Sequence, residues 1–151
     1  MYSEVEETLK KRLGELVEEA KQVAQKHWEY HLSENANREP SEKGRLNVYV
    51  RCKGETVEIY WAKYRFIKPL DGGRSRIRSS YLKRGRGHWY MDSTLTRAGK
   101  AWEVAKAIEV EKELGGIRAE VQSVKKALRY VRDASKRGNE RMVVASKQEA
   151  A

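Results

Sequence analysis

Residues 46–67 read LNVYVRCKGETVEIYWAKYRFI, and this stretch decides the fold. In its first part, Leu46, Val48 and Val50 alternate with other side chains, a period of two that is typical of a β-strand with one buried face. After a short turn, residues 56–67 are rich in the β-branched and aromatic side chains that strands favour. Two such runs around a tight turn predict an antiparallel hairpin.

The chain that follows extends this hairpin into a meander. A turn-forming segment at 69–73 leads to a strand-like run at 74–82, and a second tight turn at 84–87 leads to a short run at 88–91. Within residues 56–67 the apolar positions change phase, which predicts a β-bulge or a bend. We therefore expect four antiparallel strands joined by short turns.

Helical patterns lie on both sides of the meander. Residues 3–34 carry apolar side chains at heptad spacing. A similar seam runs from Thr94 to about Lys136, with Asp92 or Ser93 as its expected N-cap. The seams are compatible with pairing of the two helices, with covering of the sheet, or with a homodimer.

The C-terminal helix contains two adjacent glycines, Gly115-Gly116. Two glycines cost about 2 kcal/mol relative to alanine inside a helix. The pair therefore predicts a kink, a break, or a close approach by another backbone.

These elements define an α+β fold class: an N-terminal helix, a four-stranded antiparallel β-meander and a long C-terminal helix. Residues 1–137 are expected to form a single domain. Residues 138–151 are polar and small, which predicts a flexible C-terminal tail.

The sequence favours a cytoplasmic location. The N-terminal segment MYSEVEETLKK is acidic and amphipathic, unlike a signal peptide. No run approaches the length of about 18 apolar residues that a membrane span needs. The single cysteine, Cys52, excludes an internal disulfide framework and suits a reducing compartment, and its place on the apolar side of the first strand assigns it to the core.

Positive charge is concentrated in the middle of the chain. The 32 lysine and arginine residues face 22 aspartate and glutamate residues, which gives a net charge of +10. Residues 41–100 hold 15 of these basic residues and 5 of the acidic ones, so their excess equals that of the whole chain. Tyrosine and tryptophan residues are interspersed with the basic residues of the same segment. A localised basic surface with interleaved aromatic side chains is the pattern expected of a nucleic-acid binder.

Alternation along the third strand places three arginines on one face, where guanidinium groups match phosphate oxygens and guanine edges. Neighbouring strands are expected to extend this face with Arg51, Lys53 and Tyr60, and the glycine-flanked turn after the strand forms a basic loop. The candidate nucleic-acid-binding residues are Arg51, Lys53, Arg74, Arg76, Arg78, Lys83, Arg84 and Arg86, and the candidate base-stacking residues are Tyr49 and Tyr60.

Structural roles are the alternative for the same residues. A row of arginines also solubilises an open sheet face and discourages aggregation at its edge. The loop is equally well explained as a plain hairpin turn. Trp61 and Trp89 are assigned to the core, since large aromatic side chains of a sheet are usually buried.

Enzyme chemistry and metal binding have little support. His27 and His31 stand one helical turn apart, a spacing that can bind zinc, but no cluster of cysteine or histidine supplies further ligands. The sequence has no phosphate-binding loop, no paired carboxylates in the basic region and no histidine-based triad. We therefore expect a protein that is not an enzyme and needs no cofactor or metal.

The order of elements resembles the MobI-like mobilisation proteins of integrative conjugative elements and related plasmids. The resemblance spans roughly residues 46–136. It rests on Ile59-Tyr60-Trp61, the basic strand and turn from Arg74 to Gly87, Trp89-Tyr90, Ala101-Trp102-Glu103, and Glu111-x-x-Leu114-x-x-Ile117-Arg118. It implies an auxiliary protein that recognises an origin of transfer and helps a separate relaxase to nick and export DNA.

The first hypothesis is therefore a non-enzymatic DNA-binding accessory protein of conjugative mobilisation, with duplex DNA favoured over single strands and a relaxase or other transfer protein as partner. The second is an RNA- or single-strand-binding module that stacks bases on its tyrosines. The third is a coiled-coil adaptor whose helix seams bind a protein, with the positive charge serving solubility.

Overall fold

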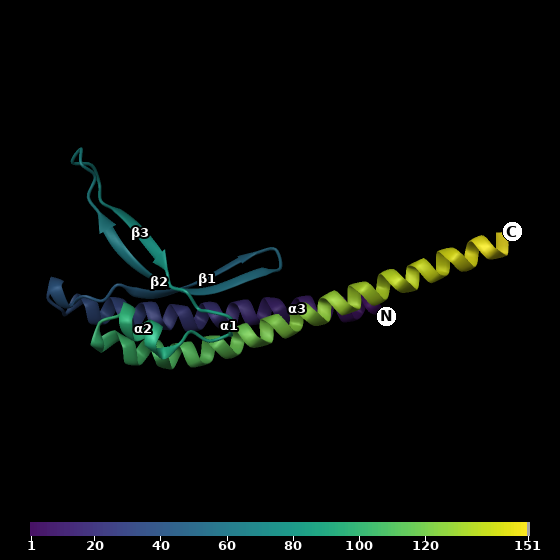
Figure 1. The fold of residues 1–151 in the computed structure, drawn as a ribbon, viewed down its shortest axis with the longest axis horizontal. Helices are drawn as coiled ribbons and strands as arrows, with labels where there is room; N and C mark the ends of the chain where they lie inside the picture. The colour runs from purple at the N-terminus through teal and green to yellow at the C-terminus, as the bar shows by residue number, and fades with distance from the viewer. Residues whose placement is uncertain (151) are drawn as a thin grey trace.

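The computed structural model describes residues 1–150, which fold into two long helices that carry a three-stranded antiparallel sheet (Figure 1). The fold class predicted from the sequence, α+β, is confirmed. The elements in chain order are α1 (Tyr2–Ala36), the 3-10 turn η1 (Pro40–Glu42), β1 (Leu46–Lys53), β2 (Thr56–Ile67), β3 (Arg76–Tyr81), α2 (Asp92–Ala98) and α3 (Ala101–Ala150).

The predicted fourth strand is wrong. Residues 88–91 form an irregular connection between β3 and α2. The backbone N–H of Tyr90, which a strand would offer to a neighbouring strand, donates instead to a carboxylate oxygen of Glu111 on α3 at 2.7 Å. The sequence pattern of this segment resembles a strand, but a helix side chain takes its backbone donor.

The C-terminal helical region divides at a different point from the one expected. α3 passes through Gly115-Gly116 without a break, and the interruption lies at Gly99 and Lys100, between α2 and α3. Here the Glu103 carboxylate accepts the backbone N–H of Lys100 at 2.8 Å. A glutamate in the first turn that reaches back to the N-cap amide is half of a capping box, so it marks the start of a new helix.

Two other details at the helix ends differ from expectation. Asp92 or Ser93 was predicted to cap the helix, but Met91 is the N-cap of α2, and no side chain of residues 1–150 caps it. α3 continues past Lys136 to Ala150, and the side chains of residues 139–150 are exposed. The flexibility of this tail stays a prediction.

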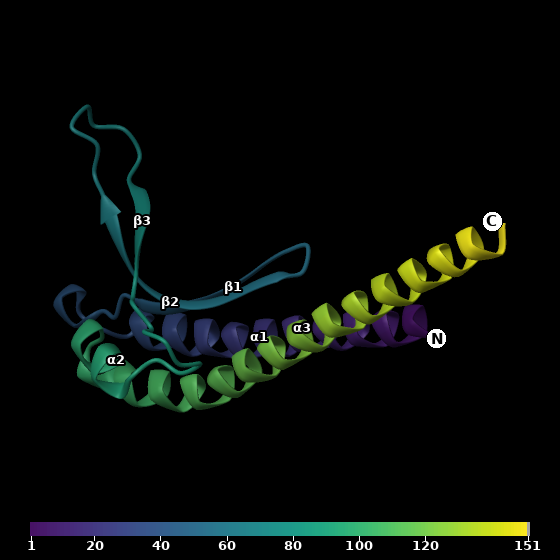
Figure 2. The same ribbon diagram turned by 45° about the vertical axis from the view of Figure 1, so that its right-hand side comes forward.

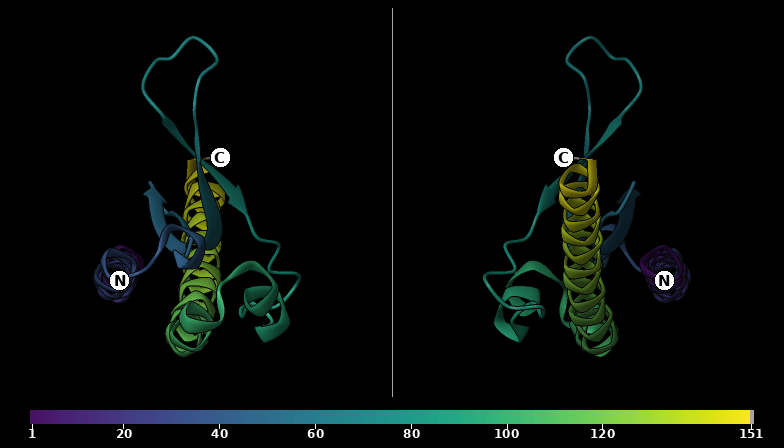
Figure 3. Two further views of the ribbon diagram at one scale, coloured as in Figure 1. Left: turned by 90° about the vertical axis from the view of Figure 1, so that its left-hand side faces the viewer. Right: turned by 90° about the vertical axis from the view of Figure 1, so that its right-hand side faces the viewer.

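α1 and α3 lie side by side and run in opposite directions (Figures 1 and 3). Figure 3 also shows α2 on the far side of α3 from α1. The heptad seams pair with each other: Leu13, Leu16 and Ala20 from α1 join Leu114 and Leu128 from α3 in one buried cluster. Burial of apolar seams is the main favourable term for such a helix pair. The two helices therefore pair with each other within one chain, which is one of the three arrangements that the sequence left open.

The sheet has β2 at its centre. β1 pairs with it from Leu46↔Lys63 to Lys53↔Thr56, and β3 pairs with its outer half from Ala62↔Tyr81 to Ile67↔Arg76. Both registers are continuous, so the phase change in the sequence reflects a bend rather than a bulge. Figure 2 shows β2 curving away from the helices, so its outer half and β3 project from the body of the molecule.

The inner half of the sheet packs on the helices. Trp61, predicted to be in the core, is fully buried, as are Leu46 and Val48. The same assignment was wrong for Trp89, which is 47% exposed because its ring lies over Gly115 on the surface of α3. Cys52 was also assigned to the core, but it is exposed because the β1–β2 hairpin tip extends beyond the helix contacts. Within residues 1–150, no helix combines the length and the apolar character that crossing a lipid bilayer requires.

Candidate nucleic-acid interface

A hairpin of exposed basic residues projects from the fold, and we call residues 63–78 the basic arm. Directly paired residues share a face of a sheet. Arg78 lies opposite Arg65, whereas the intervening Ile77 lies opposite Phe66. The arm is thus a two-stranded ribbon with one basic face and one apolar face. Arg76 and Arg78 share a face as predicted, but Arg74 precedes β3 and belongs to the turn.

The positive charges of the arm are not neutralised by neighbours. Asp71 is the single acidic residue of this segment. Within residues 1–150, none of the arm's basic side chains has a carboxylate oxygen within 4.0 Å. The basic side chains of the arm are Lys63, Arg65, Lys68, Arg74, Arg76 and Arg78, all exposed.

A second basic surface is a groove of about 1110 Å³ between the edge of β2, the connection after β3, and α3. We call it the basic groove. From α3 it receives Lys125, Lys126 and Arg129, which the sequence analysis did not propose. Their positions recur at helical spacing beside the apolar seam, and this recurrence is the signal that could have found them. The groove is lined by Arg51, Tyr60, Tyr81, Arg84, Arg86, Lys125, Lys126 and Arg129, among others.

The predicted binding residues therefore divide between two places. Arg74, Arg76 and Arg78 belong to the arm, whereas the groove holds other members of the set. Those in the groove are Arg51, Arg84, Arg86 and Tyr60. Lys53, Lys83 and Tyr49 line neither surface.

One part of the predicted arrangement is wrong. Arg51, Lys53 and Tyr60 were expected to extend the face of the arginines on β3. Tyr60 lies two positions from Ala62, whose partner on β3 is Tyr81, so Tyr60 shares a face with Tyr81. The β1 register puts Arg51 and Lys53 on that same face. Arg76 and Arg78 point to the opposite one, because the strand period is two.

A row of tyrosines crosses the sheet and ends in the groove. Tyr49 and Tyr60 are stacked with ring centroids 5.5 Å apart, and Tyr60 meets Tyr81 edge-on at 4.8 Å. Trp28 on α1 packs edge-on against Tyr49 at 6.1 Å. Tyr49 and Tyr60, the predicted stacking residues, are half-buried, whereas Tyr81 is 65% exposed. The ring that is open to a ligand is thus Tyr81.

Ion pairs brace the wall of the groove. Arg132 on α3 donates to Glu6 on α1 at 2.9 Å and, through Nη1, to Glu55 in the β1–β2 turn at 2.9 Å. These hydrogen bonds lower the pKa of both carboxyl groups. Arg51 pairs with Glu58 at 3.4 Å. Because its partners neutralise it, Arg132 supports the hairpin tip rather than a ligand.

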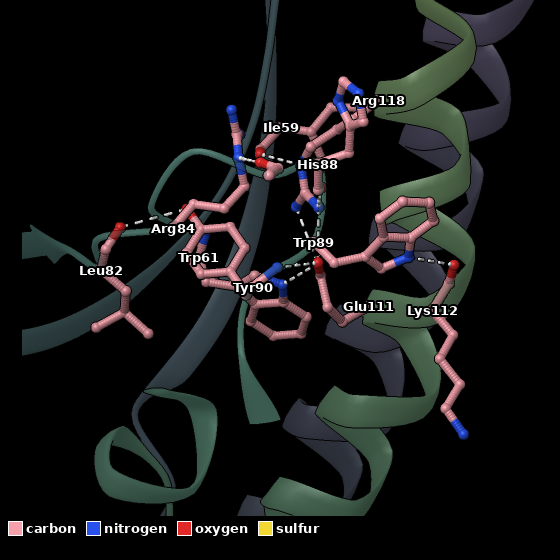
Figure 4. A network of polar contacts seen from close by, with 11 residues as sticks. Ile59, Trp61, Leu82, Arg84, His88, Trp89, Tyr90, Glu111, Lys112 and Arg118 are labelled. Carbon is pink, nitrogen blue, oxygen red and sulfur yellow. Dashed lines mark hydrogen bonds and ion pairs between the residues drawn. The ribbon is translucent and has the colours of Figure 1, made fainter. Parts of the chain in front are cut away.

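Arg118 lines the groove and forms a buried ion pair with Glu111 (Figure 4). Two nitrogens of the Arg118 guanidinium donate to the two carboxylate oxygens at 2.7 and 2.9 Å. Arg118 also donates to the Ile59 carbonyl on β2 and to the His88 carbonyl, each at 2.8 Å. The Trp61 indole donates to Glu111 at 2.8 Å. This network connects β2 and the segment after β3 to about two turns of α3.

The connection after β3 is held in two further ways. The Tyr90 hydroxyl accepts the backbone N–H of Trp61 at 3.2 Å and donates to the Leu82 carbonyl at 3.3 Å. Arg84 donates to the Gly87 carbonyl at 2.8 Å, which closes the glycine-containing loop (Figure 4). These bonds fix the segment that carries Arg86 to the groove.

The histidine pair of α1, His27 and His31, is buried among packed side chains. His31 Nε2 accepts the Asn35 amide at 3.1 Å and lies 2.8 Å from the Tyr64 hydroxyl oxygen. Its Nδ1 lies 3.5 Å from the Glu103 carboxylate. Burial lowers the pKa of His27 and of His31 to about 4 and raises the pKa of Glu103. Within residues 1–150, no three His, Cys, Asp or Glu side chains gather to hold a metal ion.

The fold and its surfaces define the class of protein: a small α+β protein in which a pair of long helices carries an exposed basic hairpin and a basic groove. The chain belongs to the MobI protein family, whose profile matches residues 16–132. The resemblance seen in the sequence is thereby confirmed, and the protein is mobilisation-related. The matched segment includes the arm, the groove, the Glu111–Arg118 ion pair and the histidine pair of α1. Neither the curated proteins nor the solved structures compared with the chain gave a match.

Proposed function

We propose that this protein is a DNA-binding accessory factor of conjugative mobilisation. In this proposal it recognises an origin of transfer in duplex form and assists a separate relaxase, which performs the nicking. Family membership supports the mobilisation role. The DNA-binding role rests on the basic arm.

The arm has the shape and charge of a duplex-binding element. A two-stranded β-ribbon fits into the major groove of B-DNA. The basic face of the arm presents Arg65, Arg76 and Arg78 together, with Arg74 in the turn beside them. One guanidinium group can donate two parallel hydrogen bonds to the oxygens of a phosphate, and it can also donate to the O6 and N7 atoms of guanine. The absence of carboxylate partners within residues 1–150 leaves these groups available.

Fluorescence anisotropy with labelled duplexes tests the proposal. The wild-type protein should bind an origin-of-transfer duplex more tightly than a scrambled duplex, with affinity that falls steeply between about 50 and 200 mM salt. The variant Arg74→Ala/Arg76→Ala/Arg78→Ala should bind more weakly and show a salt slope smaller by up to about 2.7, since each lost phosphate contact lowers it by about 0.9.

A matched control separates contact from net charge. Lys136→Ala/Arg141→Ala/Lys147→Ala removes the same three charges from exposed positions on the distal part of α3. This variant should bind like the wild type. If both triple variants lose affinity equally, the arm has no special role. If the wild type binds no DNA even at low salt, the proposal fails and the protein-adaptor hypothesis is favoured.

A further inference from the structure

We propose that the basic groove binds single-stranded DNA, so that the protein holds a junction between a duplex on the arm and an unpaired strand beside it. This inference rests on the proposed function, because the arm supplies the duplex half of the junction. The groove supplies the other half through free positive charge and an exposed aromatic ring.

Four cations of the groove are available to a ligand, whereas its two carboxylates, Glu55 and Glu58, are paired with Arg132 and Arg51. Arg86, Lys125, Lys126 and Arg129 are exposed, and within residues 1–150 none has a carboxylate oxygen within 4.0 Å. Lys125 and Arg129 lie one helical turn apart, which places their Cα atoms about 6 Å apart along α3. A line of unpaired cations along one wall matches the phosphates of an extended strand.

The aromatic ring is positioned for stacking on a base. Tyr81 is 65% exposed, and Tyr60 supports it from behind in an edge-on contact of 4.8 Å. Tyr60 is in turn stacked on Tyr49, so the ring at the end of the row is held by the sheet. Single-strand binders combine a positively charged groove with base stacking on aromatic side chains, a contact that tolerates any sequence.

The same arrangement excludes an intact duplex from this ring. The bases of a duplex are stacked inside the helix, and a side chain in a groove of about 1110 Å³ can reach a base face only after the base is unpaired. The groove is slightly larger than the usual range of small-ligand pockets, about 300–1,000 Å³, and this size suits a few nucleotides.

The two surfaces are joined by one strand. β3 carries Arg76 and Arg78 on the arm and ends at Tyr81 in the groove. At about 3.3 Å per residue, Arg76 and Tyr81 are about 17 Å apart along the strand. Because Arg76 and Arg78 point to the face of β3 opposite Tyr81, the unpaired strand of a fork held on the arm passes around the outer edge of β3 to reach the groove, within a few base pairs of the duplex.

Anisotropy with three labelled DNA probes tests this inference: a duplex, the same duplex with one unpaired oligothymidine arm, and the oligothymidine alone. The wild type should bind the forked probe more tightly than the duplex. Tyr81→Ala should weaken forked-probe binding at least about fivefold and leave duplex binding unchanged, since a stacked base contributes about 1–3 kcal/mol. Tyr81→Phe, which keeps the ring, should behave like the wild type.

The charge contribution is tested by Lys125→Ala/Lys126→Ala/Arg129→Ala, with Lys136→Ala/Arg141→Ala/Lys147→Ala as the matched control. The groove variant should lose binding to the oligothymidine and lower the salt slope of forked-probe binding, whereas the control should not. If the Tyr81→Ala variant and the groove variant both bind the forked probe as tightly as the wild type does, the inference is overturned. Tighter binding of an RNA strand than of the DNA strand would also overturn it.

Failure of the two proposals can be told apart. In one outcome the arm variant still binds the duplex, but Tyr81→Ala no longer binds the forked probe more tightly than the duplex. The groove inference then stands and the proposed role of the arm fails. If the arm variant loses duplex binding but the groove variants bind all three probes like the wild type, the proposed function stands and the groove inference fails.

Discussion

The indole ring of Trp89 lies against the backbone of Gly115 on α3, where a Cβ atom would overlap the ring. The indole N–H donates to the Lys112 carbonyl at 3.2 Å, one turn earlier on the same helix. A side chain, rather than a second backbone, thus makes the close approach that the glycine pair indicated. Among the described residues, no atom apart from those of its chain neighbours and the local helix backbone lies within 4 Å of the Cβ position of Gly116, so the two glycines differ in role.

The glycine pair gives a matched test of this contact. Gly115→Ala should destabilise the protein by about 1–3 kcal/mol, because the added methyl group displaces Trp89. Gly116→Ala should stabilise it by up to about 1 kcal/mol, because alanine has the higher helix propensity and meets open space. Urea unfolding followed by circular dichroism measures both effects. If the two substitutions change the free energy of unfolding equally, the close contact of Trp89 with Gly115 does not distinguish the two glycines.

The buried pair beneath the groove should be sensitive to loss of one partner. Arg118→Met leaves the Glu111 carboxylate buried without its counter-charge, and we expect a loss of about 3–5 kcal/mol in the free energy of unfolding. The double variant Glu111→Gln/Arg118→Met should lose less than the sum of the single variants, since no uncompensated charge remains. Additive losses in urea unfolding would show that the two side chains act independently.

Stability should fall on mild acidification because of the buried histidines. The pKa of His27 and of His31 is lowered to about 4 by burial. Between about pH 6.5 and pH 4 the unfolded chain binds protons that the folded protein does not, so their contribution to stability is complete above pH 6.5 and declines as pH falls toward 4. Each histidine contributes at most about 1.4 kcal/mol per pH unit. The raised pKa of Glu103 acts in the opposite direction.

His27→Leu isolates half of this effect. Within residues 1–150, neither ring nitrogen of His27 has a hydrogen-bond partner, and its ring packs against Trp61 at 5.0 Å. An apolar side chain of similar size should therefore be tolerated. Urea midpoints at pH 7.5 and pH 5.0 should differ less in this variant than in the wild type. An unchanged difference would assign the pH dependence to other groups.

Two arginines of the groove should respond differently to removal. Arg86 has no carboxylate within 4.0 Å among the described residues, whereas Arg132 is held by Glu6 and Glu55. Arg86→Ala should lower the salt slope of DNA binding by about 0.9 with little change in stability. Arg132→Ala should reduce stability and leave the slope nearly unchanged. The reverse pattern would mean that the ion pairs at the hairpin tip open when DNA binds.

The sequence predicted well those elements that follow from local periodicity. The seams of α1 and α3 and the pairing of β1 with β2 depend on spacings of 3.6 and 2 residues, which are visible in one chain. The segment at 88–91 was mistaken for a strand because the acceptor of its backbone N–H, Glu111, is 21 residues away. A hydrogen bond of this kind leaves no trace in a local pattern.

Local sequence patterns also predicted only part of the candidate site. The charge excess of the middle segment predicted Arg84 and Arg86 as candidate binding residues, and both line the basic groove; their role in binding stays a prediction. Lys125 and Arg129 were missed because their contribution depends on how α3 packs beside β2, which the seam does not specify. Which arginines share a face with Tyr60 likewise depends on register between strands, and the spacing within one strand does not determine it.

The bend in β2 divides one strand into two regions of unequal mechanical support. Near Trp61 the strand is hydrogen-bonded on both edges and packed on the helices, whereas beyond Phe66 it has a single neighbour and solvent on both faces. Opening of the outer part therefore leaves the core intact. We expect a gradient of amide hydrogen exchange along β2, slow at Trp61 and fast toward Ile67. A protease that cuts the turn at 69–73 should release no part of the folded body.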